Sequence, residues 1–151
     1  MPPVTSITVV YDSDCGLCTH TKEWIKQQTP LVELCFLASE SSEARRRFPQ
    51  LPAGELAVVA NTGEVWLGNH AWIVCLWALQ GYRDLAVRLT GPLLLLMARQ
   101  AFAVVSRNRS ALSSMLSLRS DREIEQQLRK VVVPKCRIEP KKRPDQERGK
   151  A

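Results

Sequence analysis

The sequence predicts an α/β fold built as one globular domain, and three observations support this prediction. The chain has 151 residues, of which 45% are hydrophobic, and this is enough for one sizeable core. Strand-like and helix-like patterns alternate from the N-terminus to about residue 81. Several helical segments without strands follow, and we expect them to pack onto the strand-containing part.

The first strand and helix are predicted over residues 7–26. Residues 7–11 (ITVVY) are β-branched or aromatic, and Asp12-Ser13-Asp14 ends the strand just before a helical pattern. Four residues at helical spacing form the expected core face of this helix: Leu17, Thr21, Trp24 and Ile25. Three charged residues are expected to face solvent: Lys22, Glu23 and Lys26. Thr29-Pro30 is expected to end the helix, because a residue before proline avoids helical geometry.

The next segments predict a strand, a short helix and a hairpin. Residues 32–37 (VELCFL) are apolar at nearly every position, which is typical of a strand in the interior of a sheet. Residues 41–48 predict a short charged helix that Pro49 closes. Two strands over residues 56–60 and 64–67 are joined through Asn61-Thr62-Gly63, and this predicts an antiparallel hairpin.

A third helix is predicted over residues 71–80, with Asn69 as its N-cap and Gly81 as its stop. It is apolar almost all round, so we expect it to be covered on two sides. The resulting order is that of a thioredoxin-like βαβαββα core, with the first two strands parallel. Further helices over residues 84–89, 93–105 and 110–118 are expected to complete a domain over residues 1–118.

The C-terminal part of the chain differs in composition from this domain. Residues 121–130 are polar, and they predict an exposed helix within the segment 119–133. Residues 134–151 contain seven Lys or Arg and three Asp or Glu, which gives 7 − 3 = +4 of the net charge of +6. Proline and charge predict a disordered basic tail here. Because the excess charge lies in the tail, we expect no nucleic-acid-binding face on the domain.

The apolar run at residues 93–98 is far shorter than the roughly 20 residues of a membrane span. We therefore expect no membrane span but a buried or amphipathic helix, with peripheral membrane contact as the alternative. The N-terminus lacks the features of a secretory signal, and the five cysteines are odd in number and widely scattered. These observations predict a protein of the reducing cytoplasm.

The Cys15-x-x-Cys18 pair is the strongest candidate for chemistry. Helix positions three apart have Cβ atoms roughly 5–6 Å apart, and a small relaxation brings them to disulfide distance. Unpaired N–H groups and the dipole at a helix start favour a thiolate, which predicts Cys15 as the attacking sulfur and Cys18 as the resolving one. Metal binding and an unreactive pair remain alternatives, although the sequence has no second Cys-x-x-Cys. Cys35 and Cys75 lie in apolar segments and are expected to be buried, inert thiols.

Asp12 and Asp14 lie immediately before the cysteine pair. Asp14 is expected to cap the helix by accepting from N–H groups of its first turn. A carboxylate near Cys15 is expected to raise the pKa of the thiol. It could also take the proton from Cys18 as that sulfur attacks a mixed disulfide. Capping alone and capping with proton transfer both stay open.

Three segments of the chain resemble the DCC family of thiol-disulfide oxidoreductases, small thioredoxin-like proteins named for an Asp-Cys-x-x-Cys motif. They are residues 11–18 (YDSDCGLC), 61–71 (NTGEVWLGNHA) and 105–109 (VSRNR). The resemblance covers residues 7–110. Ser13 stands where the family commonly has glycine, and a positive φ there would strain the turn.

This resemblance implies a protein-disulfide reductase. Its expected catalytic residues are Cys15, Cys18, Asp14 and Asp12, and no cofactor or metal is expected. The expected partners are a disulfide-containing protein or small-thiol substrate and an external thiol reductant. The alternative is a thioredoxin-like binding or adaptor module without redox turnover. The resemblance gives Arg107 and Arg109 no defined role.

Overall fold

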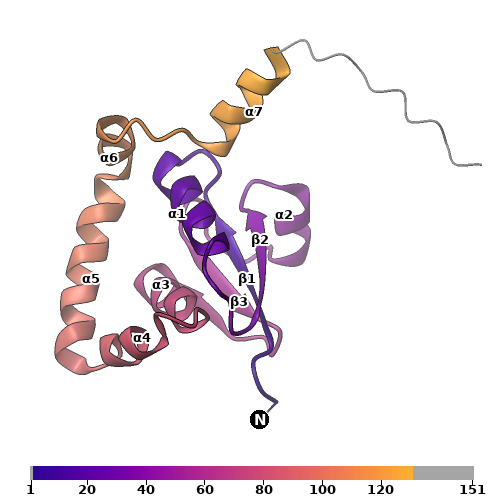
Figure 1. Cartoon of the computed structure of the whole chain (residues 1–151). Helices are drawn as coiled ribbons and strands as arrows, with labels where there is room; N and C mark the ends of the chain where they lie inside the picture. Colours follow the sequence, from indigo (N-terminus) through magenta and orange to yellow (C-terminus); the bar gives the residue numbers. More distant parts are fainter. Residues whose placement is uncertain (1, 131–151) are drawn as a thin grey trace, which may run out of the picture.

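The computed structural model describes residues 2–130 of the chain (Figure 1). Cys136 and the basic tail predicted over residues 134–151 lie outside the described residues. The predicted division of the chain at residues 118 and 133 therefore stays a prediction.

A four-stranded sheet forms the centre of the fold. Its strands are β1 (Ser6–Tyr11), β2 (Glu33–Ala38), β3 (Ala57–Ala60) and β4 (Val65–Leu67), in the spatial order β2-β1-β3-β4. β1 pairs in parallel with β2 and antiparallel with β3, and β3 pairs antiparallel with β4. The predicted parallel pair and hairpin are therefore confirmed.

The described residues contain seven helices. They are α1 (Gly16–Lys26), α2 (Ser42–Arg47), α3 (Gly68–Trp77), α4 (Arg83–Leu89), α5 (Pro92–Arg107), α6 (Arg109–Met115) and α7 (Asp121–Lys130). Figure 1 shows α1 and α3 on one side of the sheet and α2 on the other. This arrangement is the predicted thioredoxin-like βαβαββα core with additional C-terminal helices.

The prediction that the second strand lies inside the sheet is wrong, because β2 is an edge strand. Leu34 and Phe36 pack against the core from one of its faces. Cys35 points to the other face and is exposed, so it is not the buried thiol that its apolar surroundings suggested. An apolar run therefore does not place a strand in the interior when only one of its faces is well covered.

α3 begins three residues earlier than predicted, and Asn69 is not its N-cap. Leu67 occupies the N-cap position and makes no side-chain capping bond. Gly68 follows with φ of +55°, a conformation that glycine adopts without strain, and this lets β4 lead directly into the helix. α3 also ends earlier, because Leu79 bridges to Pro30 and the Ala78 carbonyl accepts from the N–H of Leu31.

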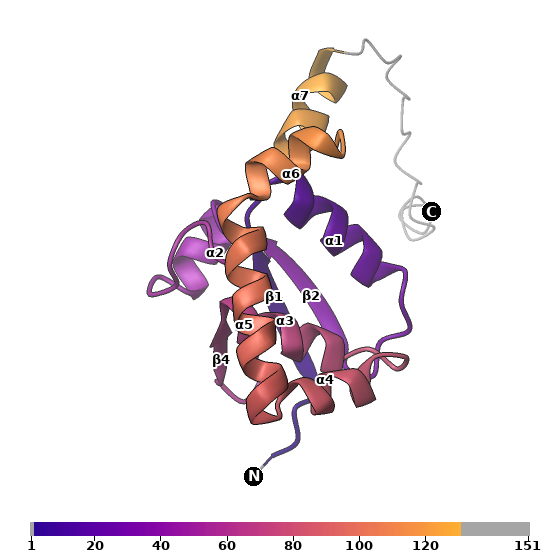
Figure 2. The same ribbon diagram turned by 90° about the vertical axis from the view of Figure 1, so that its left-hand side faces the viewer.

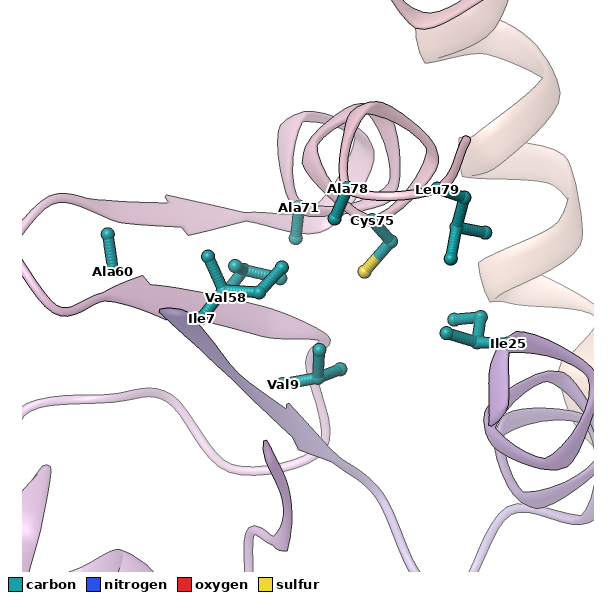
Figure 3. Close-up of a cluster of buried hydrophobic side chains, with 9 residues drawn as sticks. All are labelled: Ile7, Val9, Ile25, Val58, Ala60, Ala71, Cys75, Ala78 and Leu79. Carbon is teal, nitrogen blue, oxygen red and sulfur yellow. The ribbon is translucent and has the colours of Figure 1, made fainter. Parts of the chain in front are cut away.

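The core lies between the sheet and the helices α1 and α3 (Figure 3). Its buried members are Ile7, Val9, Ile25, Val58, Ala60, Ala71, Cys75, Ala78 and Leu79. α3 contacts β3 and β4 as well as α4 and α5, so the predicted cover on two sides is confirmed. Burial raises the pKa of the Cys75 thiol to about 12, which keeps this thiol protonated near neutral pH.

α5 runs along the outside of the fold, as Figure 2 shows. Only Leu95, Ala98 and Phe102 within it are even partly buried, whereas Leu93 is 71% exposed. No helix within residues 2–130 has by itself the length and apolar character needed to cross a membrane. The pair α4 and α5, bent by 99°, meets those criteria of length and composition together.

Candidate functional site

The turn between β1 and α1 places Cys15 at the start of the helix. Cys15 is the N-cap residue of α1, and its Sγ accepts a hydrogen bond from the backbone N–H of Cys18 at 3.4 Å. The prediction that Asp14 caps this helix is therefore wrong. The exposed Asp14 carboxylate instead accepts from Nη1 of Arg122 at 3.2 Å.

The Cys15 thiol is buried, with 8% of the residue exposed, and its pKa is lowered to about 6. The largest cause is a hydrogen bond with the Cys18 side chain. The Cys18 N–H and the charge of Arg109 act in the same direction and together outweigh burial and the charge of Asp12. The pKa of Cys18 is raised, first by the same hydrogen bond and then by burial. The pair therefore holds one thiolate and one thiol that donates to it.

The buried Asp12 carboxylate forms an ion pair with the partly exposed Arg109 beside the two cysteines. The Oδ2 atom of Asp12 lies 3.0 Å from Nη1 of Arg109, and Oδ1 accepts from the N–H of Asp14 at 2.9 Å. Nη1 of Arg109 also donates to the Gly54 carbonyl at 2.7 Å. The charge of Asp12 raises the pKa of Cys15, as the sequence predicted, but Arg109 acts against it. Sequence reasoning missed this role of Arg109, although the residue belongs to the Ser-Arg-Asn-Arg segment.

The turn accepts Ser13 without strain. Among the described residues other than glycine, only Ser117 has a positive φ, so Ser13 does not need the freedom of glycine. Its Oγ donates to Oε2 of Glu40 at 2.7 Å. This bond ties the turn to the residue that follows β2 by two positions.

Sequence comparison identifies the family of this chain. Residues 9–115 match the profile of the DCC1-like thiol-disulfide oxidoreductase family, which is more than half of the chain. The protein belongs to this family. No curated protein and no solved structure matches it. The matched residues include both aspartates, both cysteines and Arg109, so the resemblance predicted from three motifs is confirmed.

Membership of the DCC1-like family implies thiol or disulfide substrates. Within residues 2–130, no three side chains of His, Cys, Asp or Glu lie where they could hold a metal ion together. The close pair of Cys15 and Cys18 fits the Cys-x-x-Cys motif expected of a thiol-disulfide oxidoreductase family.

In this family member, a second polar cluster lies one turn further along α1. Lys22 is buried, with 8% of the residue exposed, so the prediction that it faces solvent is wrong. Its Nζ lies 2.6 Å from Oδ2 of Asp121 and 3.3 Å from the Tyr11 hydroxyl, which itself donates to Asp121 at 2.6 Å. Helical spacing could not show this, because Asp121 belongs to α7, which is 99 residues away in sequence.

The pKa values of the Lys22 cluster follow from these contacts. Burial opposes a charge on Lys22, but the hydrogen bonds with Asp121 and Tyr11 outweigh it and raise its pKa. Burial likewise opposes the Asp121 carboxylate, and the hydrogen bonds from Lys22 and Tyr11 lower its pKa. Burial raises the pKa of Tyr11. Lys22 and Asp121 are therefore both charged near neutral pH.

α6 and the segment after it pack over the start of α1. The N–H of Leu17 donates to Oγ of Ser113 at 3.0 Å, and the N–H of Asp121 donates to Oγ1 of Thr19 at 3.0 Å. A Cβ atom on Gly16 would lie 2.6 Å from the backbone oxygen of Leu118. Glycine between the cysteines is therefore required by this close approach of the chain.

The two cysteines line different spaces. Cys15 lines a groove of about 620 Å³ whose other walls are mostly polar and include Ser113 and Ser114 of α6. Cys18 lines a cavity of about 560 Å³ whose walls are mostly apolar, with Ile25 of α1 and Phe102 of α5 among them. A partner that approaches Cys15 along the groove therefore meets a different surface from one that approaches Cys18.

Proposed function

We propose that the protein is a protein-disulfide reductase that uses Cys15 as nucleophile and Cys18 as resolving residue. The observation that best supports this proposal is the low pKa of Cys15, about 6, next to a protonated Cys18. The thiolate is the form that attacks a disulfide, and at neutral pH Cys15 is mostly in that form.

The reaction has two displacement steps. The Cys15 thiolate attacks one sulfur of a substrate disulfide, the substrate S–S bond breaks, and the other substrate sulfur leaves as a thiolate. Cys18 then loses its proton and attacks Sγ of Cys15, which releases the second substrate sulfur. The substrate gains two electrons, the protein retains a disulfide between Cys15 and Cys18, and an external thiol reductant restores the dithiol.

Asp12 is the proposed acceptor of the Cys18 proton. Its buried carboxylate is near enough for its charge to act on both thiols, and Arg109 and the N–H of Asp14 hold it in place. Asp14 is exposed and paired with Arg122, so we propose for it only a supporting role in the turn.

Variants of the two cysteines test the mechanism. With a disulfide-containing protein and excess dithiol reductant, Cys15→Ser is expected to abolish turnover. Incubated with the same substrate after the reductant has been removed, pre-reduced Cys18→Ser is expected to accumulate a mixed disulfide on Cys15 that mass spectrometry detects. Cys35→Ser removes an exposed thiol outside the site and serves as the matched control, with activity expected to stay at the parent level.

The proposal is wrong if Cys15→Ser and Cys18→Ser both reduce the substrate as fast as the parent protein. The parent is also expected to form the disulfide between Cys15 and Cys18 in an oxidising glutathione buffer. A protein that never forms it would instead be a binding or adaptor module that has the fold without the reaction.

A further inference from the structure

The cavity beside Cys18 has the size and lining of a small-molecule site. Its volume of about 560 Å³ falls within the range of roughly 300–1,000 Å³ that is typical of ligand pockets. Most of its walls are aliphatic or aromatic side chains from the sheet, α1, α3 and α5, such as Val9, Phe36, Trp72 and Phe102.

The proposed reaction does not use this cavity. Displacement at a disulfide sulfur proceeds in line, so a substrate that Cys18 displaces from Cys15 lies on the side of Cys15 away from Cys18. The polar groove along α6 borders Cys15, whereas the apolar cavity borders Cys18 and does not include Cys15 among its lining residues. The cavity is therefore available to a second molecule.

The charged side chains that line the cavity indicate which polar group a bound ligand would carry. Lys22 and Arg109 are engaged by Asp121 and Asp12. Arg107 also lines the cavity, is exposed, and makes no ion pair or side-chain hydrogen bond within residues 2–130. Glu55 is the acidic residue of the lining, and it does not pair with Arg107. A guanidinium binds a carboxylate with two parallel hydrogen bonds.

We propose that the cavity binds a small amphipathic carboxylate, with its apolar body beside Cys18 and its carboxylate on Arg107. A bound apolar body displaces water from the cavity and covers the Cys18 sulfur. The ligand thus reduces access to the resolving thiol, and it leaves the groove beside Cys15 open.

Dodecanoate is the probe for this site, with dodecanol as its uncharged counterpart. Titration of the full-length reduced protein, followed by calorimetry and tryptophan fluorescence below the micelle concentration, is expected to show one saturable site. Trp72 lies in the cavity wall, so its fluorescence is expected to change on binding. Bound dodecanoate is also expected to slow alkylation of Cys18, which tandem mass spectrometry distinguishes from alkylation of the neighbouring Cys15.

Two alanines of α5 provide a matched pair of variants. Ala103 lines the cavity, Ala101 does not, and both are exposed. Ala103→Phe is expected to fill part of the cavity and weaken dodecanoate binding about tenfold, whereas Ala101→Phe leaves it unchanged. Arg107→Gln is expected to weaken dodecanoate binding about tenfold and to leave dodecanol binding unchanged.

The proposal is overturned if dodecanoate shows no saturable site, or if Ala101→Phe weakens binding as much as Ala103→Phe. The second result would place the ligand on the exposed outer face of α5. Equal effects of Arg107→Gln on dodecanoate and dodecanol would overturn the assignment of the carboxylate. None of these measurements depends on redox turnover, so this proposal and the proposed function fail independently.

Discussion

The sheet with α1 and α3 differs sharply from the outer helices α5, α6 and α7. The first region, together with the two residues that follow α3, holds the whole buried core cluster, including the fully buried Val58 and Leu79. The outer helices contain no buried residue, and they expose large apolar side chains such as Met97 and Met115. Hydrophobic burial, which dominates folding free energy, is therefore concentrated in the first region.

The redox site nevertheless depends on both regions. The sulfurs and Asp12 come from the turn and α1, whereas Arg109, Ser113 and Asp121 come from α6 and α7. These three residues make the polar contacts that hold the outer helices against α1. The first region therefore supplies most of the buried apolar surface, and the outer helices supply much of the electrostatics of the site. We therefore expect the outer helices to open at a lower cost in free energy than the core.

The largest expected effect separates the stabilities of the two regions. Leu79 is 0% exposed and Leu93 is 71% exposed, so the same change to alanine tests both environments. Leu79→Ala is expected to lower the free energy of unfolding by about 2–5 kcal/mol, because it leaves a cavity in the core. Leu93→Ala is expected to change it by less than about 0.5 kcal/mol. Urea unfolding followed by circular dichroism measures both, and equal losses would show that α5 is part of the cooperative core.

A smaller effect is expected where the regions meet at Lys22 and Asp121. Asp121→Asn leaves the buried Lys22 charge without its closest partner, and we expect a loss of about 1–3 kcal/mol in the free energy of unfolding. This is less than for a fully buried pair, because the Asp121 side chain is 30% exposed. Glu23→Gln removes the other, more exposed carboxylate near Lys22 and is the control, with a smaller expected loss. A loss for Asp121→Asn no larger than for Glu23→Gln would contradict this interpretation.

The difference in unfolding free energy between the parent and Asp121→Asn is expected to depend on pH, and the pKa shifts of the two residues give the direction. The pKa of Asp121 is lowered in the folded protein, so its contribution is present above its unfolded pKa and is lost as the pH falls through the folded value. The pKa of Lys22 is raised, so its contribution is present below its unfolded pKa and is lost as the pH rises through the folded value. The parent and Asp121→Asn are therefore expected to differ most near neutral pH and to converge in acid. A constant difference from pH 7 to about pH 3 would contradict the assignment.

The sequence predicts the strand-containing region well because its signals are local. Strand and helix patterns, turn residues and the cysteine pair place all four strands in order, and the resemblance identifies the family. The errors arise where a distant element decides the environment of a residue. Lys22 is paired with Asp121 of α7, and Cys35 is exposed because it lies on the face of β2 opposite the core. Neither fact can be read from periodicity within one segment.

For the candidate site too, the sequence predicts residues that are close together in the chain and misses contacts between distant ones. The sulfurs and the two aspartates form one continuous motif, so they are found together in the sequence. Arg109 is part of a recognisable segment, but its partner Asp12 lies almost a hundred positions earlier, and only the packing of α6 joins the two. The cap of α1 is the remaining error, because the sulfur of Cys15 takes the position that Asp14 was expected to fill.

A further expected effect is on the Cys15 thiol and not on folding. Arg109→Gln removes a charge that favours the thiolate, so the pKa of Cys15 is expected to rise from about 6. Asp12→Asn removes a charge that opposes the thiolate, so the pKa is expected to fall. At a pH below the pKa, each unit by which the pKa of Cys15 rises lowers the fraction of thiolate about tenfold. The rate of alkylation of Cys15 against pH measures the shift.

Arg107→Gln is the matched control for Arg109→Gln. It removes the same charge two positions away, and Arg107 is not among the groups that act on the pKa of Cys15. Shifts in the same direction for Arg109→Gln and Asp12→Asn would mean that the ion pair acts by positioning the turn, and not through the opposite charges of its members.

The smallest effect is expected at the exposed contact between α7 and the turn. Arg122 and Asp14 pair at 3.2 Å, but their side chains are 66% and 47% exposed. Such pairs contribute about 0–1 kcal/mol, because solvent screens the charges and long side chains lose freedom. Arg122→Ala is therefore expected to leave the unfolding free energy, the pKa of Cys15 and the turnover rate close to the parent values. Within the described residues, Arg122 contacts the Asp14 carboxylate and the Ser13 carbonyl, and no contact with the cysteines is present. A large loss of turnover without a loss of stability would therefore mean that α7 takes part in the reaction.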